Sequence, residues 1–175
     1  MIALPVLFVL GFVPKTFTVS TGAGVSQPSW HGQSSFRSIQ FEVAGRSRLF
    51  QTADVGAALT YSAIRQPRSW FGHRYGDPDD RVRAESMYLF VRKMGGRAFF
   101  DAGTGPMWSN RRVPAATSRF NFDTKLGFGL TFAERVRIGY RFSHISNAGV
   151  AHRNPGWNVH SVFAGFSVPL RSPGR

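Results

Sequence analysis

A histidine and a serine two residues apart have the clearest capacity for chemistry in this sequence. His144 and Ser146 lie in the segment 144–158, which reads HISNAGVAHRNPGWN. A neutral imidazole beside a serine hydroxyl is the smallest arrangement that cleaves an ester by nucleophilic attack. The imidazole takes the hydroxyl proton, the alkoxide attacks the carbonyl carbon, and the imidazolium protonates the leaving oxygen. On one β-strand the two residues would share a face, about 6–7 Å apart along the strand.

The elements that must position this pair are strands in which apolar and polar residues alternate. Between Arg119 and Phe132, every second residue from Phe120 onward is Phe, Leu or Thr, and the residues between them are Asn, Asp, Lys, Gly or Thr. Successive strand residues point to opposite faces, so this segment has one apolar face and one small or charged face. The pattern recurs about eight times along the chain. It is seen over 17–25, 39–43, 53–61, 119–132, 136–143 and 158–170, and less cleanly after Met87 and Arg97.

The chemistry of the second face indicates which side of the strands points inward. A soluble barrel turns its apolar face to the interior, but here the opposite face combines charges with glycines, as in the narrow polar lumen of a small membrane barrel. Strands of about ten residues also match one bilayer crossing. We therefore predict an all-β fold, an eight-stranded antiparallel transmembrane β-barrel over residues 15–170.

The connections between the predicted strands alternate in length. Long connections are expected at 26–35, 64–83, 109–118 and 147–157, and short ones at 44–46, 94–96 and 133–134. Outer-membrane barrels have short periplasmic turns and longer outer loops. The alternation therefore predicts that each long connection, and the site within 144–158, lies at the outer leaflet.

Composition and charge limit the remaining function classes. Hydrophobic residues make up 42% of the chain and the mean hydropathy is −0.16, which is too polar for a bundle of transmembrane helices. The net charge of +13 indicates an anionic partner. Because no nucleic-acid motif occurs, we expect a phosphorylated lipid surface and no nucleic acid. The absence of cysteine excludes a disulfide framework, a thiolate metal site and a cysteine nucleophile.

The two ends of the chain are expected to lie outside the barrel. Residues 1–14 contain the apolar run from Ile2 to Val13, which is too short for a membrane-spanning helix and is interpreted as a signal segment or as a buried or interfacial N-terminal segment. Residues 171–175, RSPGR, are expected to form a disordered tail. Trp30, Trp70, Trp108 and Trp157 fall at strand ends or in outer connections and predict an interfacial aromatic girdle.

The parity of the histidine–serine pair adds to its interest. His144 and Ser146 continue the apolar face of Val136, Ile138, Tyr140 and Phe142, which is the predicted lipid-facing side. Polar side chains are unfavourable on the lipid-facing side, and a substrate whose acyl chain is embedded in the outer leaflet would explain their presence. A histidine and a serine that merely contact interfacial water are the alternative.

The wider context resembles a known family. The run His144 to Gly149 (HISNAG), followed by Asn154-Pro155-Gly156 and Asn158, looks like the signature of the PagL-type lipid A 3-O-deacylases. The resemblance is strong over about 97–170 and includes the Gly-rich strand FFDAGTG at 99–105; in the N-terminal half it is mostly barrel patterning. The family consists of eight-stranded outer-membrane barrels that release the 3-position acyl chain without a metal or cofactor.

The resemblance implies roles for individual residues. His144 matches the family's base and Ser146 its nucleophile, while Asn147, Gly149 and Asn154 match candidates for binding the oxyanion. One position departs from the pattern. The family's best-known form has a glutamate that orients the histidine, and Asn158 stands at the matching position. Asn158 shares the parity of His144, so its carbonyl could accept the histidine's proton, without the charge that stabilises an imidazolium.

Three functions follow from these observations. The preferred one is an outer-membrane esterase that acts on lipid A of lipopolysaccharide, with His144, Ser146 and Asn158 as catalytic residues. A non-catalytic small outer-membrane barrel, structural or adhesin-like, is favoured by the missing acid and opposed by the intact HISNAG run. A soluble lipocalin-like carrier is the third.

Overall fold

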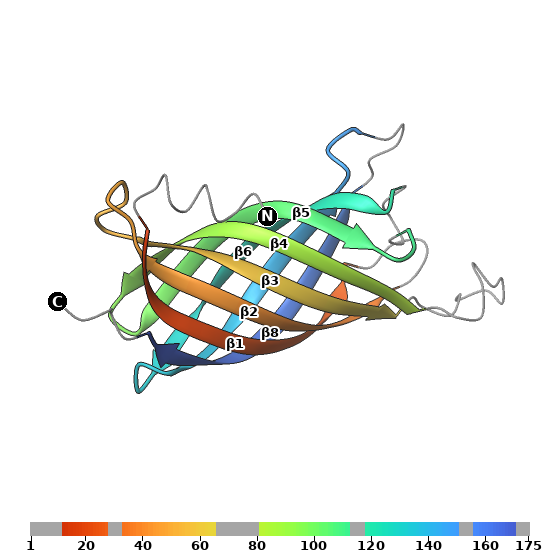
Figure 1. The fold of residues 1–175 in the computed structure, drawn as a ribbon. Coiled ribbons are helices and arrows are strands. Elements are labelled where there is room, and N and C mark those ends of the chain that lie inside the picture. Colours follow the sequence, from red (N-terminus) through yellow and green to blue (C-terminus); the bar gives the residue numbers. More distant parts are fainter. Residues whose placement is uncertain (1–11, 28–32, 66–80, 113–117, 151–155, 171–175) are drawn as a thin grey trace.

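Eight antiparallel strands form a closed barrel in the computed structural model, which describes residues 12–27, 33–65, 81–112, 118–150 and 156–170 (Figure 1). Each strand pairs with the next, and β8 pairs with β1 to close the barrel. The predicted eight-stranded antiparallel barrel is thus confirmed. The strands are β1 Val13–Ser26, β2 Ser35–Arg46, β3 Asp54–Arg65, β4 Arg81–Gly95, β5 Ala98–Ser109, β6 Phe120–Phe132, β7 Val136–Ser146 and β8 Trp157–Pro169.

The connections alternate between the two ends of the barrel as antiparallel strands require. The start of β1 and the end of β8 lie at the end that carries the shorter turns, and the strand ends joined by the four longer connections lie at the other end, called here the outer end (Figure 1). β4 and β5 are joined by Gly96 and Arg97, and β6 and β7 by residues 133–135.

One predicted turn was wrong. Residues 44–46 belong to β2, and the connection to β3 runs from 47 to 53. Gly45 pairs with Pro14 on one side and Val55 on the other, and a Cβ at this position would lie 1.9 Å from the carbonyl oxygen of Val13. The glycine therefore permits the close approach of two strand backbones and does not mark a turn.

The charged face of the strands lines the interior, as the alternation predicted. Glu42 pairs with Arg92 and, at 2.8 Å, with Arg137, and Arg92 also bonds Asp101 at 2.7 Å. Lys125 pairs with Asp123 at 3.0 Å, and the groups of all four ion pairs are largely buried. Mutual pairing offsets much of the desolvation of these charges. The interior is a packed polar core and leaves none of these carboxylates for the outer wall.

The outer wall carries the apolar side chains. Leu59, Phe128 and Ile138 are more than half exposed, at 56%, 57% and 52%. An exposed apolar belt around a polar interior is the arrangement that suits a barrel surrounded by lipid. No helix within the described residues is long and apolar enough to cross a membrane.

A second, apolar cluster fills the barrel interior near the outer end. It includes Ile145 and Trp157, which are 1% and 6% exposed. The predicted aromatic girdle is therefore wrong for Trp157, whose parity places it inside. Trp108 is 58% exposed on the wall, and Trp30 and Trp70 lie outside the described residues. The remaining cluster members are Phe36, Ile64, Val82, Ala84, Met107 and Val159.

Candidate active site

The closure of β7 on β8 brings His144 and Asn158 together. The two residues are direct cross-strand partners, and His144 Nδ1 lies 2.7 Å from Asn158 Oδ1. An amide oxygen only accepts hydrogen bonds, so Nδ1 of the histidine carries the proton and donates it. The other ring nitrogen, Nε2, is then an acceptor, which is the state that a general base requires.

A residue that the sequence interpretation did not include holds Asn158 in this orientation. The Asn158 side-chain amide donates to Gln27 Oε1 at 2.9 Å, and the Gln27 backbone N–H donates to the Asn158 carbonyl at 2.8 Å. Because Gln27 accepts from Nδ2, the Asn158 amide turns its oxygen towards His144. Gln27 follows β1 directly, and no local pattern relates it to a residue 131 positions away.

Ser146 is the last residue of β7 and lies on the same face as His144. Ile145 between them points inward and is almost fully buried, whereas His144 and Ser146 are half-buried on the outer wall. The cross-strand neighbour of Ser146 is Phe122 on β6. The serine hydroxyl therefore opens onto the lipid-facing wall at the outer end of the barrel.

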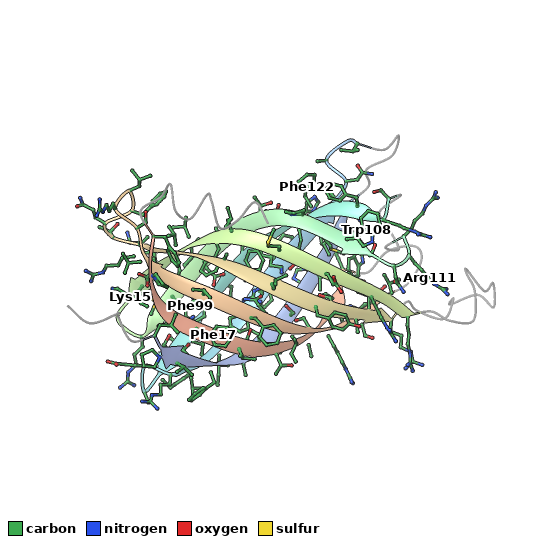
Figure 2. All side chains as sticks on the ribbon, in the orientation of Figure 1. Lys15, Phe17, Phe99, Trp108, Arg111 and Phe122 are labelled. Carbon is green, nitrogen blue, oxygen red and sulfur yellow. The ribbon has the colours of Figure 1, made fainter. Side chains whose placement is uncertain are left out.

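Aromatic rings flank the serine on the β5–β6 side. Phe120 and Phe122 form an edge-to-face pair with ring centroids 5.4 Å apart, and Trp108 is the cross-strand partner of Phe120. Figure 2 shows Trp108 and Phe122 at the outer end of the barrel, away from Lys15 and Phe99. This surface is apolar and suits a hydrocarbon chain placed beside Ser146.

The histidine ring occupies space that only a glycine leaves free. Gly156, directly before β8, has a φ of +70°, and a Cβ there would lie 2.6 Å from His144 Cε1 and 3.3 Å from Nε2. A left-handed backbone and a ring this close both exclude other side chains. Gly156 belongs to the Asn-Pro-Gly run noted in the sequence, but its contact with His144 follows from the fold alone.

The turn after Ser146 places the predicted oxyanion residues differently from one another. Asn147 is completely buried, and its Oδ1 accepts a hydrogen bond of 2.9 Å from the Gly149 N–H. Its backbone carbonyl accepts from Val150 N–H at 3.0 Å, and Gly149 has a φ of +82°. The Gly149 amide is thus engaged within the turn. Asn154 lies outside the described residues.

The acidic residues of the described segments lie away from this pair. Asp101 and Asp123 point into the barrel and pair with Arg92 and Lys125, and Glu134 sits in the turn at the opposite end. His160, two residues beyond Asn158, is hydrogen-bonded to the Tyr140 hydroxyl. Within the described segments, no group of three His, Asp or Glu side chains could hold a metal ion.

Comparison with known proteins places these features in context. Residues 12–167 match the family model described as lipid A 3-O-deacylase (PagL). The chain is 29% identical over 118 residues to the lipid A deacylase PagL of Bordetella bronchiseptica, covering 64% of this chain and 59% of that protein. It is 34% identical over 88 residues to the lipid A deacylase PagL of Pseudomonas aeruginosa, covering 47% of this chain and 50% of that protein. The matched regions thus span about half the length of these relatives.

A solved structure shares the fold. The crystal structure of the outer membrane enzyme PagL superposes with a TM-score of 0.63 at 20% identity, covering 87% of this chain and 99% of that chain.

Proposed function

The chain belongs to the lipid A 3-O-deacylase (PagL) family, and we propose that it is an outer-membrane esterase that removes the ester-linked 3-O acyl chain from lipid A. The observation that carries this proposal is the 2.7 Å bond from His144 to Asn158 on the same lipid-facing wall as Ser146. An imidazole with a fixed tautomer, two residues from a serine on the same strand face, can serve as the general base for that serine. Its position on the outer wall gives access to a lipid ester without removing the lipid from the membrane.

The proposed reaction has two steps. Ser146 Oγ attacks the ester carbonyl carbon while His144 Nε2 takes the hydroxyl proton, and the imidazolium then returns that proton to the departing sugar oxygen. Water, deprotonated by His144, attacks the acyl-serine, and the fatty acid leaves as Ser146 recovers its proton. His144 Nε2 gains and loses one proton in each step, and every other bond formed and broken belongs to the serine, the ester or water, so the scheme uses no cofactor.

Asn158 has the role of a positioning residue. Its amide oxygen holds the histidine in the tautomer with Nε2 free, and Gln27 holds the amide. A neutral amide does not stabilise the imidazolium that forms during attack, so we expect a slower reaction than a carboxylate would support.

Asn147, Gly149 and Asn154 are the proposed oxyanion groups. Because Asn147 Oδ1 accepts the Gly149 N–H, the Gly149 amide reaches an oxyanion only if this bond is exchanged for one to the substrate. Asn147 is fully buried and would donate through its own N–H groups only after the turn moves. A substrate-induced rearrangement of the turn at 147–150 is therefore part of the proposal.

A non-catalytic barrel is the second candidate function. It is favoured by the absence of a carboxylate bonded to His144 among the described residues. The exposed apolar belt opposes the third, a soluble carrier, which would turn that belt inward.

Mass spectrometry of lipid A from cells that lack a deacylase of their own tests the proposal. Expression of the protein is expected to remove one 3-O-linked acyl chain, and Ser146→Ala and His144→Ala are expected to leave lipid A intact. Ser143→Ala is the matched control, because Ser143 lies on the same strand but points into the barrel. Intact lipid A in cells that contain the folded wild-type barrel would favour the non-catalytic function.

A further inference from the structure

Four arginines gather on the outer wall at the outer end of β2, β3 and β4. Arg65 of β3 is the direct cross-strand partner of Arg81 of β4, and Arg37 of β2 and Arg83 of β4 are both partners of Ala63. All four are exposed. The central strand of this group, β3, lies four strands from β7 in either direction around the closed barrel. The cluster is therefore on the wall opposite Ser146 and cannot contact a substrate bound there.

The arrangement brings like charges together without a neutralising carboxylate among the described residues. Like charges directly opposite each other on neighbouring strands repel. None of the four arginines forms an ion pair with a residue of the described segments. The nearest carboxylate along the strand, Glu85, lies two residues from Arg83 opposite Tyr61 and is not bonded to it. A bound anion would relieve this repulsion.

The cluster surrounds a hollow. A space of about 420 Å³ is lined by the four arginines together with Ser35, Ala63 and the buried Ile64 and Val82. Ala63 lies between Arg37 and Arg83 across the three strands, and its small side chain leaves room between these two arginines. The planar guanidinium group donates two parallel hydrogen bonds to a phosphate, which makes arginine the residue best matched to phosphate recognition.

On β2 and β3 the surface next to the hollow is apolar, while Glu85 continues the same row on β4. On the same face, one step towards the middle of the barrel, lie Ile39 and Tyr61, and beyond them Phe41 and Leu59. These side chains are between 43% and 56% exposed. A cationic hollow directly above an exposed apolar strip matches a ligand with a phosphate head and hydrocarbon chains.

We propose that Arg37, Arg65, Arg81 and Arg83 form a binding site for the phosphate of a lipid head group, separate from the ester-cleaving site. The lipid's chains lie along Ile39, Phe41, Leu59 and Tyr61. Lipid A phosphates and phospholipid phosphates share the chemistry that the site recognises. The site stands independently of the hydrolytic function, because it uses none of the residues of that function.

Native mass spectrometry of the detergent-purified barrel tests this site. The protein carries Ser146→Ala so that no lipid is consumed, and it is titrated separately with bis-phosphorylated lipid A, dephosphorylated lipid A and phosphatidylglycerol. Arg65→Gln with Arg81→Gln is compared with Lys93→Gln plus Arg97→Gln, an exposed pair at the other end of the barrel that removes the same charge.

We expect the Ser146→Ala protein, the parent, to bind one more phosphorylated lipid than the Arg65/Arg81 variant does. The affinity of this site should fall by about 100-fold in the variant, roughly tenfold for each guanidinium group removed. The Lys93/Arg97 variant should behave as the parent, and dephosphorylated lipid A should not fill the site. Whichever phosphorylated lipid shows the difference is the source of the phosphate. Three outcomes would each overturn the proposal: the same loss of binding in both double variants, binding of dephosphorylated lipid A as tight as that of the phosphorylated lipids, or unchanged binding in the Arg65/Arg81 variant.

Discussion

Replacement of Gly156 by alanine tests the geometry of the site without touching a reactive group. The added Cβ would lie 2.6 Å from His144 Cε1, whereas ordinary van der Waals contact begins at 3.4 Å, so the ring must retreat by roughly 0.8 Å. Displacement of a catalytic group by about 1 Å lowers rates by about 100-fold. The ring is held at Nδ1 by Asn158, so a retreat also strains the 2.7 Å bond that sets its tautomer. We therefore expect Gly156→Ala to lower kcat/KM for lipid A deacylation by about 100-fold or more.

The backbone conformation at Gly156 contributes separately. A φ of +70° is unfavourable for alanine by about 1–2 kcal/mol, a loss of stability that the barrel should tolerate. Alanine variants of two other glycines distinguish the backbone strain at Gly156 from the clash with His144. Gly96 has a φ of +61° with nothing near its missing Cβ, and Gly95 has neither feature.

The assay measures the rate of fatty-acid release from lipid A by the purified barrel in detergent, with circular dichroism to verify folding. Gly96→Ala should lose stability as Gly156→Ala does but keep full activity, and Gly95→Ala should resemble the wild type. A folded Gly156→Ala protein with wild-type activity would refute the argument that His144 acts from the position described.

Three further outcomes are expected. Asn158→Asp should raise kcat by roughly tenfold or more, because a carboxylate stabilises the imidazolium and Gln27 can rotate its amide to donate to it. A lower kcat than that of the wild type in the same release assay would contradict the orienting role of Asn158. Glu42→Gln should lower the free energy of unfolding by about 3–5 kcal/mol in urea titrations, because it leaves the buried Arg92 and Arg137 without their shared partner. Glu134 is exposed, so the control Glu134→Gln should change the free energy of unfolding by less than about 0.5 kcal/mol. Ile145→Ala should destabilise the barrel by about 2–5 kcal/mol by opening a cavity beneath the site, and the lipid-facing Ile138→Ala should have a much smaller effect in the same titration.

Local sequence pattern was sufficient for much of the fold. A period of two needs only neighbouring residues, so the alternation in β6 and β7 predicted strands, a polar interior and an apolar outer wall. The same parity placed His144 and Ser146 on one face and Asp123 in the lumen. Two features were misplaced: Trp157 was assigned to the girdle by its position near a loop, and residues 44–46 were assigned to a short turn although they continue β2.

The tertiary structure decided how distant residues meet at the site and beyond it. Register across β7–β8 and β8–β1 determines that Asn158 bonds His144 and that Gln27 orients Asn158. The fit of Gly156 against the histidine ring depends on the path of the chain into β8. The grouping of four arginines depends likewise on the alignment of three strands. Parity is a property of one strand and can be read from its residues, whereas register is a relation between strands that only the closed barrel establishes.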